Sequence, residues 1–269
     1  MRRHHPKGSR LPALEQNILK YRAFEMVLIL FHVEELKTFV LDSIQATDSI
    51  QATDGRSPRI PSEAKEKYKK AWAILVADRI ITQVESDDIE RLIDYRNTIG
   101  HSIVQLTSDV SRSPVAETYS QFSGVKYDYE ALAKLKRYRH KISDGLRKAY
   151  ISSLSPKSLI FEAAERTYEH ELRRLAKRID RQIDVRKAEY QSLGAELVTA
   201  KRGVDELDPF HPENIAGNRT LTKRGVETCH RLFDRNLSPL AVAYLMHISY
   251  RAAMNRHRAW TRLKDAQRR

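Results

Sequence analysis

The chain has almost no cysteine, little glycine and no long hydrophobic run, and each shortage excludes a class of protein. Cys229 is the only cysteine in 269 residues, so an internal disulfide is impossible and a reducing cytoplasm is the expected compartment. No apolar stretch reaches the roughly 18 residues that a membrane span needs, and no signal-peptide pattern opens the chain. The nine glycines form no glycine-rich phosphate loop, which argues against an ATP-driven enzyme.

Metal ligands are also scarce at the spacing that coordination requires. His4 and His5 lie in a basic N-terminal tail, and no other histidines, cysteines or carboxylates fall at tight metal-ligand spacing. Cys229 stands beside His230 on an expected helix, and we interpret it as a small buried apolar residue rather than a nucleophile. The sequence therefore predicts no metal and no cofactor.

The residues that are present follow a helical period. Apolar stripes with spacings of three and four run through residues 14–41, 64–84 and 129–154, and no convincing strand pattern appears. A longer pattern covers residues 158–201, where a helix would extend roughly 60 Å at 1.5 Å per residue. We expect an all-α fold in which this long helix either forms a coiled-coil arm or dimer contact, or packs along its own domain.

Two segments interrupt the helical pattern. The hexapeptide Ser-Ile-Gln-Ala-Thr-Asp occurs twice, at 43–48 and 49–54, which we interpret as a mobile loop lengthened by duplication. Ser, Pro and Gly accumulate from 107 to 124 and predict a second loop, placed to cover the motif described below. The predicted organisation is a basic flexible tail at 1–10, a helical domain at 11–155, a long basic helix or coiled-coil arm at 156–202, and a C-terminal domain at 203–269.

Positive charge is concentrated in the C-terminal half. The net charge is +13, but residues 1–125 hold 17 Lys and Arg against 17 Asp and Glu, whereas residues 126–202 hold 19 against 11 and residues 203–269 hold 12 against 7. Clustered Lys and Arg attract polyanions and release counterions from phosphates. We therefore expect a nucleic-acid partner. A merely solvated basic face is the simpler alternative, and membrane binding is a weaker one.

One short motif combines residue types suited to RNA cleavage. Arg96-Asn97-Thr98-Ile99-Gly100-His101 lies near the end of an apolar-periodic helix. Hydrolysis of RNA without a metal needs a base or acid that titrates near neutral pH, such as a histidine, and a fixed cation for the phosphate, such as an arginine. Asn97 and His101 are four residues apart and share a helix face, so the amide is placed to orient the imidazole.

Geometry limits what one copy of this motif can do. Arg96 and His101, five residues apart, lie roughly 140° apart around a helix axis and about 7.5 Å along it. One helix presents such a pair poorly to a single phosphate, so we infer that two chains pair about a two-fold axis to complete the site. The alternative interpretation is a surface or capping histidine beside an arginine that pairs with Asp94 or Glu90.

With its surroundings, the motif resembles the signature of HEPN domains, an all-helical family whose catalytic members are metal-independent ribonucleases. Arg96 and His101 match the arginine and histidine of the family's R-x4-H motif, and Asn97 matches the polar residue that usually follows the arginine. The resemblance covers residues 11–150 loosely. Gly100 stands where the family usually has a better helix former. Ser102 follows His101 in a stretch where one toxin branch of the family carries an aromatic residue that this chain lacks. The resemblance implies a homodimer and a role such as toxin or antiviral effector, controlled by a partner.

A second pattern, near the C-terminus, looks like a helix-turn-helix. Ser238 is placed to cap a first helix that has Pro239 at its first position, and Ser249 is placed to cap a second helix. Ala243 is small enough for a helix crossing, and His247 occupies the turn position that usually holds glycine. The alternative is a three-helix packing module with a basic end. If the second helix enters a major groove, the side chains placed to reach nucleic acid are Tyr250, Arg251, Asn255, Arg256 and Arg258.

Together these patterns predict a metal-independent endoribonuclease with a C-terminal nucleic-acid-binding module. The ribose 2′-hydroxyl would attack the adjacent phosphate and leave 2′,3′-cyclic phosphate and 5′-hydroxyl ends, with His101 as base or acid, Arg96 as phosphate clamp and Asn97 orienting the histidine. The main rival is a DNA-binding regulator whose N-terminal half is only a dimerisation scaffold. A third hypothesis is a subunit of a larger nucleic-acid complex.

Overall fold

The computed structural model describes residues 13–52, 55, 57–61, 63–101, 107, 110, 127–151, 156–218 and 220–267. Regular structure in these ranges is helical, apart from one isolated antiparallel bridge between Ile215 and Leu221. The all-α fold predicted from the helical period is therefore confirmed. No helix within these ranges is both long and apolar enough to cross a membrane.

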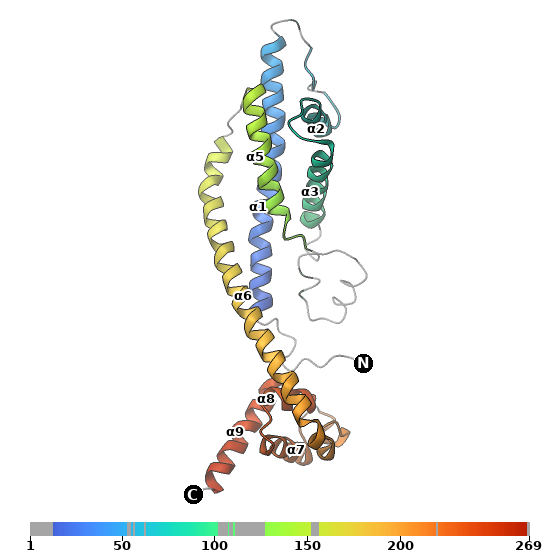
Figure 1. Ribbon diagram of the computed structural model, residues 1–269, viewed down its shortest axis with the longest axis vertical. Coiled ribbons are helices and arrows are strands. Elements are labelled where there is room, and N and C mark those ends of the chain that lie inside the picture. Colours follow the sequence, from blue (N-terminus) through green and yellow to red (C-terminus); the bar gives the residue numbers. More distant parts are fainter. Residues whose placement is uncertain are drawn as a thin grey trace. The chain divides into compact units, whose positions relative to one another are not determined.

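The chain divides into two compact units, of which the first spans Glu15–Arg178 and the second includes Ile179–Arg269. The predicted long helix is confirmed as α6 (Pro156–Val204), and the division passes through it. The boundaries predicted at 155/156 and 202/203 do not coincide with this division, because Leu172 of α6 packs in the core of the first unit and Leu193 packs in the core of the second. Both units are drawn in Figure 1.

The first unit is built around α1 (Ala13–Gln51), together with α2 (Lys67–Ala77), α3 (Gln83–His101), α5 (Ala131–Ala149) and the first part of α6. Trp72 of α2, Ile89 of α3 and Leu135 of α5 pack in the same hydrophobic core as Leu36 of α1. Each fully buried side chain of this kind contributes roughly 1.5–3 kcal/mol relative to exposure. Packing against α1, rather than helix propensity, therefore holds these helices together.

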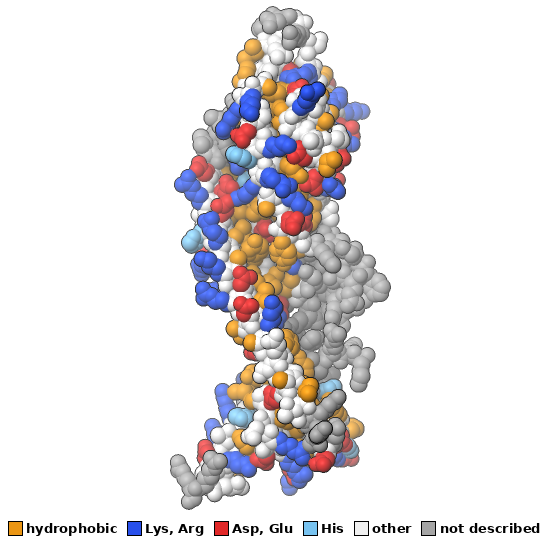
Figure 2. Space-filling view, in the orientation of Figure 1, with side chains coloured by type: hydrophobic (Ala, Val, Ile, Leu, Met, Phe, Trp, Pro, Cys, Tyr) orange, Lys and Arg blue, Asp and Glu red, His pale blue; other side chains and the backbone are white. Residues whose placement is uncertain are grey.

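Charged side chains also connect α1 to α5 and α6. Arg139 Nη2 donates to Glu35 Oε1 at 2.6 Å, and Lys136 Nζ lies 3.3 Å from Glu165 Oε1. His32 is 1% exposed, and its Nε2 lies 3.1 Å from the same Glu165 oxygen without hydrogen-bond geometry. Burial, reinforced by the two cations, lowers the pKa of His32 to about 3, so the imidazole is neutral near pH 7. Figure 2 shows Lys and Arg interspersed with Asp and Glu over the face of this unit that is drawn.

The prediction that the duplicated hexapeptide forms a loop is wrong. α1 continues to Gln51, through the whole first copy and into the second. Six residues turn a helix by about 240° beyond one full rotation, so equivalent residues face different surroundings: Ile44 is fully buried, whereas Ile50 is 60% exposed. Asp48, in the first copy, accepts hydrogen bonds from the backbone N and Nε of Arg59 at 2.8 and 2.7 Å. The loop predicted at 107–124 lies outside the described residues except at 107 and 110.

The second unit has a separate core. The end of α6 is followed by two short helices, η3 (Asp205–Leu207) and η4 (Pro212–Asn214), and by α7 (Lys223–Asp234), α8 (Pro239–Leu245) and α9 (Tyr250–Gln267). Leu232 and Phe233 of α7 pack with Val242 of α8 and Ala253 of α9. Cys229 is fully buried in this core, as predicted, and burial raises the pKa of its thiol to about 11. The thiol is therefore protonated near neutral pH.

Candidate nucleic-acid interface and catalytic helix

The start and the rotation of α3 are fixed by its sequence. Thr82 Oγ1 accepts the backbone N–H of Glu85 at 3.3 Å, and Glu85 Oε2 accepts the backbone N–H of Thr82 at 2.8 Å. This reciprocal pair is a capping box, which satisfies two free donors at the helix start. Ile89, Leu92 and Ile99 are buried against the core, so the apolar stripe predicted around the motif is confirmed. Because these apolar residues face the core, they fix the rotation of α3 about its axis and with it the side of the helix on which the motif lies.

The guanidinium group of Arg96 contacts two other side chains. Its Nη1 donates to Asn97 Oδ1 at 2.9 Å, and its Nη2 lies 3.1 Å from Glu34 Oε1 of α1. The pairing considered in the alternative interpretation, with Asp94 or Glu90, is replaced by this contact between helices. The Nε of Arg96 is buried without a hydrogen-bond partner. Because Glu34 is 49% exposed, water and salt screen the ion pair and its contribution is small.

His101 is the last residue of α3, but its side chain lies outside the described residues. The Asn97 Oδ1 accepts one hydrogen bond from Arg96 and has a second lone pair, so both the oxygen and the nitrogen of the amide can contact an imidazole. The predicted roles of His101 as acid or base, and of Asn97 as its orienting partner, stay predictions.

A partly buried polar cluster next to the motif was missed by the sequence analysis. Tyr127 donates to Glu25 Oε2 at 2.8 Å, and Arg22 donates to the Tyr129 hydroxyl through Nε at 2.9 Å and Nη2 at 2.6 Å. The ring of Tyr127 also meets that of Tyr95, the residue before Arg96. Burial raises the pKa of Glu25 to about 7. The available signal was a pair of charged residues, three apart, on the apolar stripe of α1.

The local elements expected at the C-terminus are present. Ser238 and Ser249 each accept a backbone N–H from the residue three positions later, at 3.2 and 3.1 Å, so both predicted caps are confirmed. Pro239 is the first residue of α8, and Ala243 is fully buried. His247 has a φ of 51°, the left-handed conformation that the turn position was expected to need.

α9 presents one polar face that contacts no partner side chain within the described ranges. Arg251, Asn255, Arg258 and Arg262 are all exposed, and their spacing of four, three and four places them within about 60° of one line along the helix. We call these four residues the α9 stripe. Among the described residues, none forms a hydrogen bond or ion pair with them. Ala253, on the opposite face, is fully buried against the core.

The α9 stripe contains three of the five predicted contact residues. Arg256 is exposed but lies off the stripe, near α7, where its charge adds to the burial that lowers the pKa of His230. Tyr250 is partly buried in the first turn. Arg262 was missed because it lies beyond the short motif, although the helical spacing extends to it without a break.

No group of three or more His, Cys, Asp or Glu side chains in the described ranges is arranged to hold a metal ion. Comparison of the chain with models of known families, with curated proteins and with solved structures found no match.

Proposed function

We propose that this protein binds double-stranded DNA through α9. The observation that carries the proposal is the α9 stripe, in which three arginines and one asparagine share an exposed face that follows a capped helix and a left-handed turn. Arginine pairs with the major-groove edge of guanine through two hydrogen bonds, and asparagine does the same with adenine. The residue types therefore match both base edges and phosphates.

The α9 stripe contrasts with arginines of the first unit that are paired with carboxylates. There, arginines such as Arg139 and Arg59 are held by carboxylates at 2.6 and 2.7 Å, so their charge is largely offset within the fold. The arginines of the α9 stripe have no such partner in the described part of the chain. Their positive field is available to attract a phosphate backbone.

DNA binding is tested by fluorescence anisotropy with random and selected duplexes. We expect Arg251→Ala or Asn255→Ala to weaken binding to a selected duplex about tenfold, because each removes a two-bond contact to a base. Arg231→Ala is the matched control, since Arg231 is an exposed arginine of α7 that pairs with Glu227 at 2.6 Å. Equal losses in all three variants would contradict the proposal.

We further propose that α3 contributes a ribonuclease site, in line with the HEPN-like motif. Supporting observations are the partial exposure of Arg96 and Asn97, their direct contact, and the weak hold of the exposed Glu34 on Arg96. Arg96 would exchange Glu34 for the scissile phosphate, and His101 would move the proton of the attacking 2′-hydroxyl or protonate the leaving 5′-oxygen. A second chain would complete the site. A cytoplasmic toxin or antiviral effector under the control of a partner fits this activity.

RNA cleavage is tested by incubating purified wild-type and His101→Ala protein with labelled tRNA and single-stranded RNA in EDTA. We expect only the wild type to cut, leaving 2′,3′-cyclic phosphate and 5′-hydroxyl ends. Arg96→Lys, which keeps the charge but loses the planar fork, should cut more slowly than wild type. If wild type and His101→Ala both leave every RNA intact, the DNA-binding regulator with a non-catalytic dimerisation scaffold replaces this part of the proposal.

A further inference from the structure

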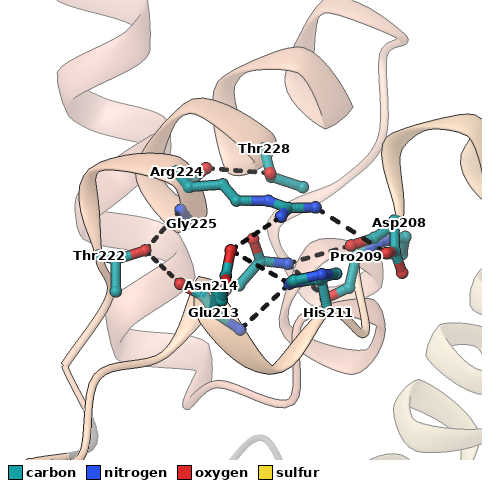
Figure 3. A network of polar contacts seen from close by, with 9 residues as sticks. All are labelled: Asp208, Pro209, His211, Glu213, Asn214, Thr222, Arg224, Gly225 and Thr228. Carbon is teal, nitrogen blue, oxygen red and sulfur yellow. Dashed lines mark hydrogen bonds and ion pairs between the residues drawn. The ribbon is translucent and has the colours of Figure 1, made fainter.

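The segment between α6 and α7 contains a solvent-exposed aromatic side chain, which lies on a rigid turn. Phe210 is 61% exposed, and the turn that carries it is closed by a hydrogen bond from the backbone N of His211 to the carbonyl of Asp208 at 3.1 Å. Asn214, which is 1% exposed, donates through Nδ2 to the carbonyls of Asp208 and Pro209, both at 3.1 Å (Figure 3). A buried amide thus fixes the backbone on the N-terminal side of Phe210.

The same network ties this turn to α7. Thr222 Oγ1 donates to the carbonyl of Glu213 at 2.6 Å and accepts the backbone N–H of Gly225 at 3.1 Å, so that one side chain joins the turn to the helix start (Figure 3). A Cβ atom at Gly225 would lie 2.1 Å from the carbonyl oxygen of Asn214. Only glycine allows this approach, and the turn is therefore part of the rigid framework of the second unit.

The ring of Phe210 meets the ring of His247, with 5.3 Å between centroids and 84° between planes. His247 is also exposed and lies in the turn that leads into α9, four residues before Arg251. Asp208 and His247 both have positive φ, at 42° and 51°. Such backbone conformations are unfavourable for most residues and occur often at binding sites. We call Phe210 and His247 the aromatic pair.

The surroundings of the aromatic pair favour a flat, polar-edged ligand over an apolar protein surface. Asp208, Pro212 and Glu213 are exposed around Phe210, so the ring does not belong to an extended apolar patch of the kind that protein interfaces use at their centre. Arg224 bridges the two carboxylates and offsets one of their two charges, because its Nη1 lies 3.2 Å from Glu213 Oε2 and its Nη2 lies 3.9 Å from Asp208 Oδ2. A nucleobase has the required shape and polarity.

We propose that Phe210 stacks on an unpaired nucleobase beside the duplex that α9 binds, while His247, whose ring is nearly perpendicular to that of Phe210, supports the Phe210 ring. The inference rests on the proposed DNA binding and extends it, since it makes a duplex with a single-stranded overhang the preferred ligand. Phe210 supplies the apolar face for stacking. The hydrogen bonds of the turn hold this ring in place at the end of the α9 stripe. The expected preference for an overhang over a blunt duplex is about tenfold, the size of one stacked base.

The test compares a blunt duplex with the same duplex carrying a three-nucleotide overhang that contains 2-aminopurine. We expect Phe210→Ala to lose the preference while keeping the affinity for the blunt duplex, and Phe210→Trp to keep the preference and to quench the 2-aminopurine fluorescence. The matched control is Val198→Ala, which shortens an apolar side chain of the same unit that is 74% exposed.

Four results would overturn the inference. Equal binding of both duplexes by wild type would refute stacking but leave the proposed DNA binding in place. An equal loss for both duplexes in Phe210→Ala would mean that Phe210 contacts the backbone, and a change in the sedimentation of that variant alone would mean that Phe210 lies in an interface between proteins. Failure of wild type to bind either duplex would refute the proposed function and this inference together.

Discussion

Arg96 of the first unit and the arginines of the α9 stripe are in opposite electrostatic situations. Arg96 is 27% exposed and is held by Glu34 and Asn97, whereas the α9 arginines face solvent with no partner among the described residues. A phosphate would have to displace a partner to reach Arg96, whereas no described side chain would have to be displaced from the α9 stripe. The comparison shows that a recognisable motif and an available binding surface are separate properties, which in this chain lie in different units.

The largest effect is expected when the packing of the second unit, which supports α9, is disrupted. Gly225→Ala should lower the free energy of unfolding of the second unit by about 3 kcal/mol, because the new Cβ collides with the backbone of Asn214. Trp260 fluorescence during denaturation in a Trp72→Phe background measures this unit alone. Gly194→Ala, where nothing lies within 4 Å of the added carbon, should instead leave the unit unchanged or stabilise it by up to about 1 kcal/mol. Similar losses in both variants would contradict the account.

Two buried groups of the first unit should respond to pH in opposite directions. The folded-state pKa of Glu25, about 7, lies above its usual value, so its stabilisation is fully present below about pH 4.5 and is lost as the pH rises through 7. His32, with a folded-state pKa of about 3, contributes stability that is present above about pH 6.5 and is lost as the pH falls toward 3.

Replacing Glu25 isolates one of these two titrations. Between pH 4.5 and 7 the loss of about 2–3 kcal/mol from Glu25 is opposed by a rise of similar size from His32, so the stability of the wild-type first unit should change little. Glu25→Gln removes only the loss, so its first unit should become about 2–3 kcal/mol more stable over the same range. Trp72 fluorescence in a Trp260→Phe background reports on that unit. The same pH dependence in both proteins would show that Glu25 does not titrate as its burial implies.

Removing the carboxylate that pairs with Arg96 should make the environment of Arg96 more like that of the arginines in the α9 stripe. Glu34→Gln should cost less than about 1 kcal/mol of stability, because the ion pair is exposed, and should strengthen RNA binding about threefold. Filter binding with labelled single-stranded RNA measures the affinity. Glu130→Gln, which removes an exposed partner of Lys134, is the control. A loss of RNA binding in Glu34→Gln alone would show that Glu34 holds Arg96 in its working position.

Local patterns in the sequence were sufficient to predict the helical fold class, the long helix α6 and the caps of α8 and α9. The period of three and four identified the all-α fold and α6, and the serines at 238 and 249 were recognised as caps because a short hydroxyl side chain before a helix satisfies a free backbone N–H. The same rules could be extended to Arg262, which repeats the spacing of Arg251, Asn255 and Arg258.

Contacts between distant residues could not be predicted in this way. The partner of Arg96 is Glu34, on another helix, and no local pattern relates the two. The duplicated hexapeptide was taken for a loop because duplication was given more weight than helical period, although Ile44 and Asp48 extend the buried face of α1. Rotation of the helix, rather than a difference in sequence, gives the two copies their different roles.

The most direct test of the central claim is the salt dependence of binding to duplex DNA. A plot of log affinity against log salt concentration should lose about 1.8 units of slope in the double variant Arg258→Gln/Arg262→Gln, because each phosphate contact contributes about 0.9. The account predicts this loss together with an unchanged slope for Arg231→Gln. A wild-type protein with no salt-dependent affinity, or a double variant with the wild-type slope, would contradict the claim that the α9 stripe binds DNA.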